Sequence, residues 1–248
     1  MPPEKAEALV IRLADFSESS RVVTFFTREF GKSSALAKGV KRLKGPFEGS
    51  IDLLAHVQII LYRKDHDALD LVTEAQLVSR FAPPSKEIFP LYAGYYVAEL
   101  LDIGTEPHDP HAILFDEAIA TLDRLSESTD PRFAIMRFEL LLLREIGNLP
   151  GFTHCVHCET AATASRGSKF WVTASGLICE ACGRPEYEHA AIQPGSVRLL
   201  QQLSTDEAPA LQELSPTASQ IKEVRRIVTA AVTHALDRKP KMLGYLKF

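Results

Sequence analysis

The sequence predicts an α+β protein in which a five-stranded β-barrel precedes an α-helical domain with an inserted four-cysteine motif. Three observations support this prediction. Short β-branched and aromatic runs alternate with turn residues over residues 1–82, the apolar spacing becomes helical after residue 83, and all four cysteines lie between residues 151 and 186. We therefore expect a barrel domain at 1–82 and a helical domain at 83–248, interrupted by a metal-binding segment at 151–186.

The N-terminal strands are short and evenly spaced. Turn-forming groups such as Asp15–Ser20 and Phe30-Gly31 separate them. Strands of this number and length fit a small barrel or a sandwich, and we interpret them as a barrel. The expected strands are Glu7–Leu13, Arg21–Thr27, Lys32–Val40, Val57–Tyr62 and Leu71–Phe81.

The helical part begins with apolar residues from Ile88 to Leu100 at intervals of three and four, the spacing of one buried helix face. Asp109-Pro110 and Asp130-Pro131 each predict a helix start, with an acidic N-cap before a proline. The second of these helices is apolar nearly all round up to Gly147, so we expect it at the centre of the helical domain. Two more helices are expected at Pro194–Leu203 and Pro216–Leu236.

The composition is that of an ordinary soluble protein, with 248 residues, 46% apolar residues and a net charge of −4. The charge is uneven, because residues 1–50 sum to +3, residues 221–248 to +5 and the segment between them to −12. Two basic ends can attract a polyanion despite the acidic average. The longest apolar stretch, 138–146, is too short for a membrane span, and the N-terminus lacks a signal sequence, so we expect a cytoplasmic protein.

The cysteines form two Cys-x-x-Cys pairs, Cys155/Cys158 and Cys179/Cys182. This spacing lets both sulfurs of each turn meet on one ion, so the motif predicts one structural zinc ion held by four thiolates. Two disulfides and a thioredoxin-like redox pair are the alternatives, but neither a secreted context nor a βαβ pattern supports them.

A zinc nucleotide deaminase is a further alternative. His157-Cys158-Glu159 followed by Cys179-x-x-Cys182 contains the His-x-Glu and Cys-x-x-Cys elements of that enzyme class. A deaminase needs an open coordination position for water, and here Cys155 supplies a fourth thiolate while Ile178 replaces the usual proline. We therefore favour the structural interpretation.

A basic run in the barrel domain is the candidate nucleic-acid site. Residues 38–44 contain four cations and no acid, and further cations lie in or beside the preceding strands. A solvated loop would explain the run alone, but its place in a barrel-sized β domain favours a groove that follows a phosphodiester backbone. The candidate residues are Arg21, Arg28, Lys32, Lys38, Lys41, Arg42 and Lys44.

Exposed aromatic residues often stack on bases in such sites. Phe16 and Phe47 lie at expected turns and Tyr62 ends a strand, whereas Phe25 alternates with Val23 and is expected in the core. No phosphate loop, dinucleotide-binding glycine motif or nucleophile elbow is present, so we expect no enzyme.

Taken in order, these features resemble the RecO family of bacterial DNA repair proteins. The resemblance covers Ala8–Arg42, including the Ala37-Lys38-Gly39 turn; Gly147–Pro150 with both cysteine pairs; and the basic tail Asp237–Lys241. Ser175 and Met242-Leu243 depart from the family's usual pattern. The resemblance implies an N-terminal OB-fold, a helical C-terminal domain and an inserted zinc motif.

The resemblance also implies a function in DNA repair and homologous recombination. A protein of this family is expected to bind single- and double-stranded DNA, to anneal complementary strands, and to act with RecR in loading RecA onto strands covered by single-strand-binding protein (SSB). It implies a nucleoid-associated protein and a binding site in the helical domain for the acidic-hydrophobic SSB tail, for which the candidates are Lys222, Arg225 and Arg226. A zinc-ribbon adaptor that binds only proteins is the alternative from another class.

Overall fold

The structure is a computed structural model that describes residues 2–42, 47, 49–64, 69–127, 131–162, 168–183, 189–205 and 216–248. These residues divide into two compact units. Unit 1 comprises residues 1–131 with 242–246, and unit 2 comprises residues 132–241 with 247–248. The predicted domain boundary at 82/83 falls between the last barrel strand and the first helix. That residues 1–82 form a separate domain stays a prediction.

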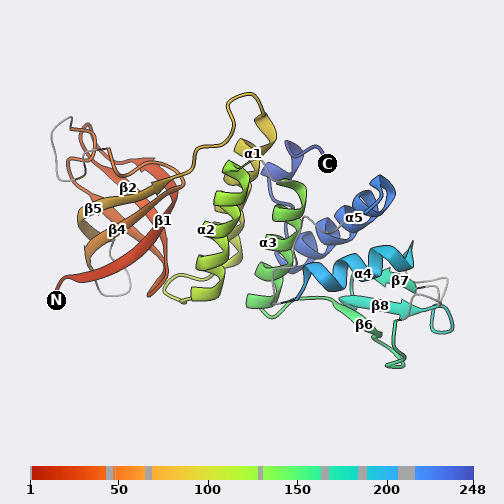
Figure 1. Ribbon diagram of the computed structural model, residues 1–248. Helices are drawn as coiled ribbons and strands as arrows, with labels where there is room; N and C mark the ends of the chain where they lie inside the picture. Colours follow the sequence, from red (N-terminus) through yellow and green to blue (C-terminus); the bar gives the residue numbers. More distant parts are fainter. Residues whose placement is uncertain are drawn as a thin grey trace. The chain divides into compact units, whose positions relative to one another are not determined.

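Unit 1 begins with the predicted five-stranded barrel (Figure 1). Its strands are β1 (Glu4–Asp15), β2 (Arg21–Thr27), β3 (Gly31–Ala37), β4 (Ala55–Tyr62) and β5 (Asp70–Arg80). They close in the order β1-β2-β3-β5-β4, with β3 and β5 parallel and the other neighbours antiparallel. The prediction of a barrel, rather than a sandwich, is confirmed.

The barrel is held by residues that alternate toward its interior, as on the faces of β3, where every second residue is buried. Val23 and Phe25 of β2 are fully buried, as predicted for Phe25. Phe47 lies at a turn, as expected, but it is only 2% exposed and belongs to the same core, so its interpretation as an exposed stacking residue is wrong. Its ring packs into the core together with Ile51 because the connection between β3 and β4 supplies apolar side chains to the barrel interior.

The end of β3 follows from a glycine. The strand stops at Ala37, three residues before the predicted end, because Gly39 adopts a φ of +78°, which a side chain would disfavour. The chain then turns so that the amide of Arg42 donates to the carbonyl of Gly39 at 3.0 Å. Lys38, Lys41 and Arg42 therefore lie in a turn beyond the strand and not in the strand itself.

Two helices complete unit 1, α1 (Ile88–Gly104) and α2 (Ala112–Ser126), with a short 3₁₀ turn, η2 (Met242–Gly244). The ring of Phe115 in α2 lies against Phe26 and His56 of the barrel, with centroids 6.4 and 5.9 Å away. The start predicted at Asp109-Pro110 is wrong, since α2 begins at Ala112. The preceding segment is tied to β3 by a hydrogen bond from the His108 amide to the Lys32 carbonyl, and the φ of +62° at His108 is not helical, so the helix begins later.

Unit 2 contains α3 (Pro131–Glu145), α4 (Pro194–Leu203) and α5 (Ala218–Ala235). Helix α3 is buried from Phe133 to Leu143, which confirms its central position, and it begins at the predicted proline; Asp130 lies outside the described residues. It ends as predicted at Gly147, whose φ is +72°. The amides of Gly147 and Asn148 donate to the carbonyls of Arg144 and Leu143, the Schellman pattern that closes a helix.

A small sheet follows α3, formed by β6 (Gly151–Cys155), β7 (Ser168–Trp171), β8 (Gly176–Cys179) and β9 (His189–Ile192) in the order β6-β8-β7-β9 (Figure 1). Strands β7 and β8 form an antiparallel hairpin between the two cysteine pairs, β9 pairs antiparallel with β7, and β6 pairs parallel with β8. Among the described residues, no helix combines the length and the apolar character that crossing a bilayer requires.

Candidate metal centre and nucleic-acid interface

Each cysteine pair follows the end of a strand in the small sheet. Cys155 ends β6 and Cys179 ends β8, and these strands are parallel neighbours, so both pairs emerge at the same edge. Tight turns follow each first cysteine: the amide of Glu159 donates to the carbonyl of Cys155, and that of Cys182 to the carbonyl of Cys179. The sheet topology therefore brings together two sequence motifs that lie twenty residues apart.

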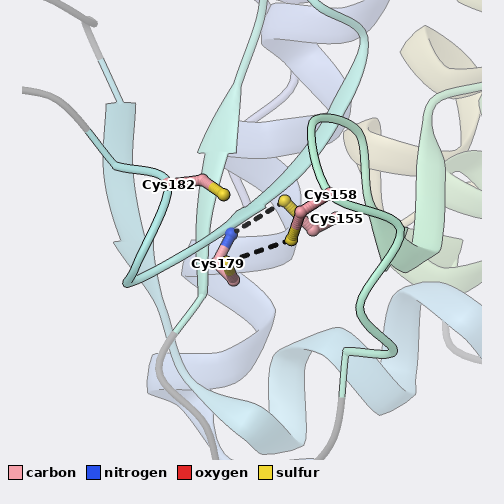
Figure 2. A group of neighbouring side chains, drawn as sticks. All are labelled: Cys155, Cys158, Cys179 and Cys182. Carbon is pink, nitrogen blue, oxygen red and sulfur yellow. Dashed lines mark hydrogen bonds between the residues drawn. The ribbon is translucent and has the colours of Figure 1, made fainter.

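The four sulfur atoms lie within 4.8 Å of one another and face a common space (Figure 2). The sulfurs of Cys158 and Cys179 are 3.7 Å apart. A tetrahedral zinc ion with Zn–S bonds of about 2.3 Å separates its ligands by about 3.8 Å, so this distance suits a shared metal ion. It is far longer than the roughly 2.05 Å of a disulfide bond, which disfavours the disulfide alternative.

The protonation of the cluster also suits a cation. Hydrogen bonds from Thr160 and from neighbouring cysteines lower the pKa of Cys158 to about 6. Its hydrogen bonds with Cys158 and Cys179 raise the pKa of Cys182 to about 12. Burial opposes ionisation of Cys155, but backbone N–H groups of Cys179, Cys158 and His157 outweigh it and lower the pKa of that thiol. A metal ion here would bind the four sulfurs as thiolates, so its binding would displace the remaining thiol protons, that of Cys182 among them.

The position of Cys155 separates a structural site from a deaminase-like one. Cys155 is only 2% exposed, and the amide of Cys179 donates to its sulfur at 3.4 Å, so its side chain is fixed within the cluster. Four sulfur ligands complete a tetrahedral sphere and leave no position for a reactive water molecule. The donor set therefore fits a closed, structural metal ion.

The second candidate site lies at one end of the barrel, and we call Arg21, Lys38, Lys41 and Arg42 the basic end. In the sheet register, Arg21 begins β2 opposite Ala37, the last residue of β3 and the neighbour of Lys38. The amide of Lys41 donates to the carbonyl of Ser19 at 3.2 Å, which joins the turn after β3 to the turn between β1 and β2. Four of the seven predicted cations thus come together.

The cations of the basic end differ in what they contact. Lys38 and Arg42 are exposed, and neither forms an ion pair with any residue that the structure describes. Arg21 and Lys41 both bind Asp15, the last residue of β1, at 3.0 Å each. Lys44 lies outside the described residues.

Arg28 and Lys32 lie at the opposite end of the β2–β3 hairpin, where Thr27 pairs with Gly31. The guanidinium of Arg28 donates two hydrogen bonds of 2.9 Å to Asp116 of α2, which raises the pKa of Arg28 and lowers that of Asp116. The ammonium of Lys32 donates to the carbonyls of Asp102 and Thr105 at 2.5 and 2.6 Å. These two cations face the helices of unit 1 and do not extend the basic end.

The aromatic candidates differ in how far their side chains are exposed to solvent. Phe16 is 61% exposed in the turn between β1 and β2, directly after Asp15, whereas Phe25 and Phe47 are buried. Tyr62, at the end of β4, is 37% exposed. Only Phe16 thus joins the basic end as an exposed aromatic side chain next to the cations that Asp15 binds.

The three candidates of the partner site lie on two sides of α5. Lys222 and Arg226 are exposed and one turn apart. Arg225 is buried, and its guanidinium binds the fully buried carboxylate of Glu139 in α3 through both nitrogens. The ring of Phe248 lies over the same guanidinium, with its centroid 4.1 Å away. Arg225 therefore stabilises the packing of unit 2 and leaves Lys222 and Arg226 as the surface pair.

Two acidic residues that contact the candidate sites were not singled out from the sequence. Asp15 and Arg21 flank the predicted turn between the first two strands, and opposite charges on the two sides of such a turn were a usable signal for the pair that the register shows. Glu139 offered none, because an acid within an apolar helix has no visible partner until the fold brings Arg225 to it.

Comparison with known proteins agrees with these features. The family model described as "Recombination protein O N terminal" matches residues 1–81, and that described as "Recombination protein O C terminal" matches residues 85–243. The DNA repair protein RecO of Rhodopirellula baltica is 39% identical over 84% of this chain and 73% of its own length.

Other relatives with the same name are more distant. RecO of Desulfitobacterium hafniense is 30% identical over 94% of this chain and 85% of its own length. RecO of Bacillus subtilis is 28% identical over 79% of this chain and 75% of its own length. With both family regions matched and the barrel, helical unit and cysteine cluster in place, the chain belongs to the RecO family, whose members act in DNA repair and recombination.

Proposed function

We propose that this protein is a recombination mediator that acts without catalysing a reaction. It binds single- and double-stranded DNA without sequence specificity, anneals complementary strands, and together with RecR helps to load RecA onto SSB-covered single strands in the cytoplasm, at the nucleoid. The observation that carries the DNA-binding part of this proposal is the basic end, where cations from two barrel turns meet beside an exposed phenylalanine.

The chemistry of the basic end suits a phosphodiester backbone. Lys38 and Arg42 are exposed donors, and such side chains neutralise phosphates without reading base edges. Nonspecific binding of this kind releases counterions and depends steeply on salt. Annealing follows when a cationic surface holds two strands close together and reduces the repulsion between their phosphates.

The cysteine cluster supports a structural zinc ion as part of the proposal. Cys155, Cys158, Cys179 and Cys182 would hold it, and the ion would join the ends of β6 and β8. The small sheet buries few large side chains, among them Phe152, Phe170 and Leu177, so a metal ion would supply much of its stability.

Lys222 and Arg226 remain the candidates for the acidic tail of SSB. They project from one face of α5, where two cations can bind the carboxylates of an acidic-hydrophobic peptide. A Lys222→Ala/Arg226→Ala variant should lose binding of a fluorescent peptide of that composition. Unchanged peptide binding would move this site elsewhere.

The DNA-binding proposal is tested with a fluorescent single-stranded oligonucleotide of mixed sequence, titrated at several salt concentrations. We expect Lys38→Ala/Arg42→Ala to weaken binding on the order of tenfold at about 0.1 M salt and to reduce the salt slope by about 1.4, the value for two lost phosphate contacts. The matched control is Lys5→Ala/Lys86→Ala, which removes two exposed cations of unit 1 outside the basic end.

The control variant should bind as the wild type does, because Lys5 and Lys86 lie outside the basic end. Its net charge equals that of the test variant, so the overall charge cannot explain a difference between the two variants. Equal losses in both variants would mean that only the overall charge matters and not the basic end. Salt-insensitive binding, or no binding by the wild type, would overturn the proposal and favour a zinc-ribbon adaptor that binds only proteins.

A further inference from the structure

Asp15 bridges two cations of the basic end. Its carboxylate oxygen Oδ1 lies 3.0 Å from Nε of Arg21, and Oδ2 lies 3.0 Å from Nζ of Lys41. The Asp15 side chain is 68% exposed, so this is a surface position open to solvent. A group with two anionic oxygens between an arginine and a lysine occupies the position that a backbone phosphate takes on such a pair.

The carboxylate lowers the charge that the basic end offers to DNA. Arg21 and Lys41 together carry two positive charges, and the ionised Asp15 cancels one of them. Hydrogen bonds from Lys41 and from Arg21 hold the pKa of Asp15 below its ordinary value. Asp15 is therefore ionised at every physiological pH, and a change in cellular pH does not release the two cations.

The turn after β3 does not depend on Asp15 for its position. The ammonium of Lys41 also donates to the carbonyl of Ser17 at 3.1 Å, and the amide of Lys41 donates to the carbonyl of Ser19. Arg21 is placed by its ladder partners Asp15 and Ala37 through the backbone of the sheet. Both cations thus stay near each other when the carboxylate loses its charge.

We infer that Asp15 is an internal competitor at a phosphate-binding position, which a DNA phosphate must displace before Arg21 and Lys41 can engage it. This inference rests on the proposed DNA binding at the basic end and names a control on that binding. The competitor keeps affinity moderate, which suits a protein that must release the strands that it pairs. Removing the negative charge of Asp15 should therefore strengthen DNA binding.

The test is Asp15→Asn, measured with the same oligonucleotide in the full-length protein. The amide retains one acceptor oxygen and the size of the side chain, so the fold is kept, and a thermal unfolding curve checks this. We expect a three- to tenfold gain in affinity at about 50 mM salt and a salt slope steeper by about 0.7, the value for one further phosphate contact.

Glu18→Gln is the matched control. Glu18 is an exposed acid in the same turn that forms no ion pair with any described residue, and its substitution changes the net charge equally. We expect less than a twofold change for this variant. In an Arg21→Gln/Lys41→Gln background, Asp15→Asn should give no more gain than Glu18→Gln, because the two cations that it frees are missing.

The outcomes separate this inference from the proposed function. If Lys38→Ala/Arg42→Ala loses affinity and Asp15→Asn gains no more than Glu18→Gln, DNA binds at the basic end and Asp15 is no competitor. Weaker binding by a folded Asp15→Asn variant would likewise overturn the inference, since Asp15 would then position the cations. If neither variant changes affinity, both statements fail, and the DNA site lies elsewhere.

Discussion

Phe16 is the residue at which a preference for single strands can arise. It is 61% exposed, and its amide donates to the carbonyl of Ser20 at 3.1 Å, which fixes the turn and keeps the ring outside the barrel. Bases of a single strand are free to stack on such a ring, whereas bases in a duplex already stack on each other. Phe16 directly follows Asp15, whose two carboxylate oxygens bind Arg21 and Lys41.

We predict that Phe16→Ala weakens binding of a single-stranded oligonucleotide by the worth of one stacked base, about 1–3 kcal/mol. Duplex binding should change less than twofold, and the salt slope should stay the same because no phosphate contact is lost. Competition titrations with both forms of DNA measure this. Phe16→Trp is the control and should keep or strengthen the preference. An equal loss for both forms would contradict a stacking role.

Single residues also show where sequence reasoning ends. Phe25 was assigned to the core because it alternates with Val23, a pattern that its strand neighbours make visible. Phe47 and Arg225 could not be placed, because their burial depends on partners distant in sequence: Phe47 enters a core built by all five strands, and Arg225 meets Glu139, 86 residues away. Residue type alone therefore leads to an overestimate of how many candidate residues are exposed at the surface.

At the scale of elements, the sequence predicted most strands and helices and the cysteine cluster. Helix α4 (Pro194–Leu203) and strand β2 (Arg21–Thr27) match their predicted bounds. Both are bounded by local sequence signals, a proline at the start of α4 and turn residues on both sides of β2. The start of α2 and the strand β9 were missed. Both depend on pairing with distant segments, Lys32 with Pro107 in one case and β7 with β9 in the other.

Lys32 illustrates an element-scale role for a residue first assigned to DNA. Its side chain is 13% exposed, and its ammonium donates to the carbonyls of Asp102 and Thr105 at the C-terminal end of α1. A cation at this end also interacts favourably with the helix dipole. Lys32 thus joins β3 of the barrel to α1 within unit 1.

We expect Lys32→Met to lower the free energy of unfolding by about 1–3 kcal/mol, the cost of leaving buried carbonyl groups without a donor. Oligonucleotide affinity should change less than twofold. Urea unfolding and oligonucleotide titration measure the two effects. Lys38→Met is the matched control with the opposite expected outcome, unchanged stability and weaker DNA binding. A Lys32→Met variant that keeps its stability but loses DNA affinity would show that Lys32 contacts DNA and does not mainly stabilise unit 1.

At the scale of the whole molecule, the structure shows which of the basic residues are exposed and which are paired with acids. The excess of +3 over residues 1–50 includes the basic end, and its effective charge is set by Asp15. The other basic tract includes Arg238, Lys239 and Lys241, all exposed after α5, while Arg225 is neutralised by Glu139. A net charge of −4 therefore coexists with a local cationic surface, and polyanion binding depends on the local field.

The two candidate sites lie in different compact units, the basic end in unit 1 and the cysteine cluster in unit 2. If the metal ion is structural, its removal should act on the small sheet and not on the barrel. The sheet consists of short strands, and its buried core includes Phe152 and Phe170, stacked with their centroids 6.2 Å apart. Without a metal ion, the sulfurs that meet at the ends of β6 and β8 repel each other once ionised.

We therefore predict that removing zinc with a chelator increases hydrogen exchange at residues 151–162 and 168–183 and leaves exchange in β1 to β3 unchanged. Oligonucleotide affinity should stay within about twofold of the zinc-loaded protein, because phosphate contacts at the basic end do not involve the cluster. Adding zinc back should restore the protection, and a Cys158→Ser variant should resemble the chelated protein. A parallel loss of DNA binding would mean that the zinc segment contributes DNA contacts, and the basic end alone would then not account for the interface.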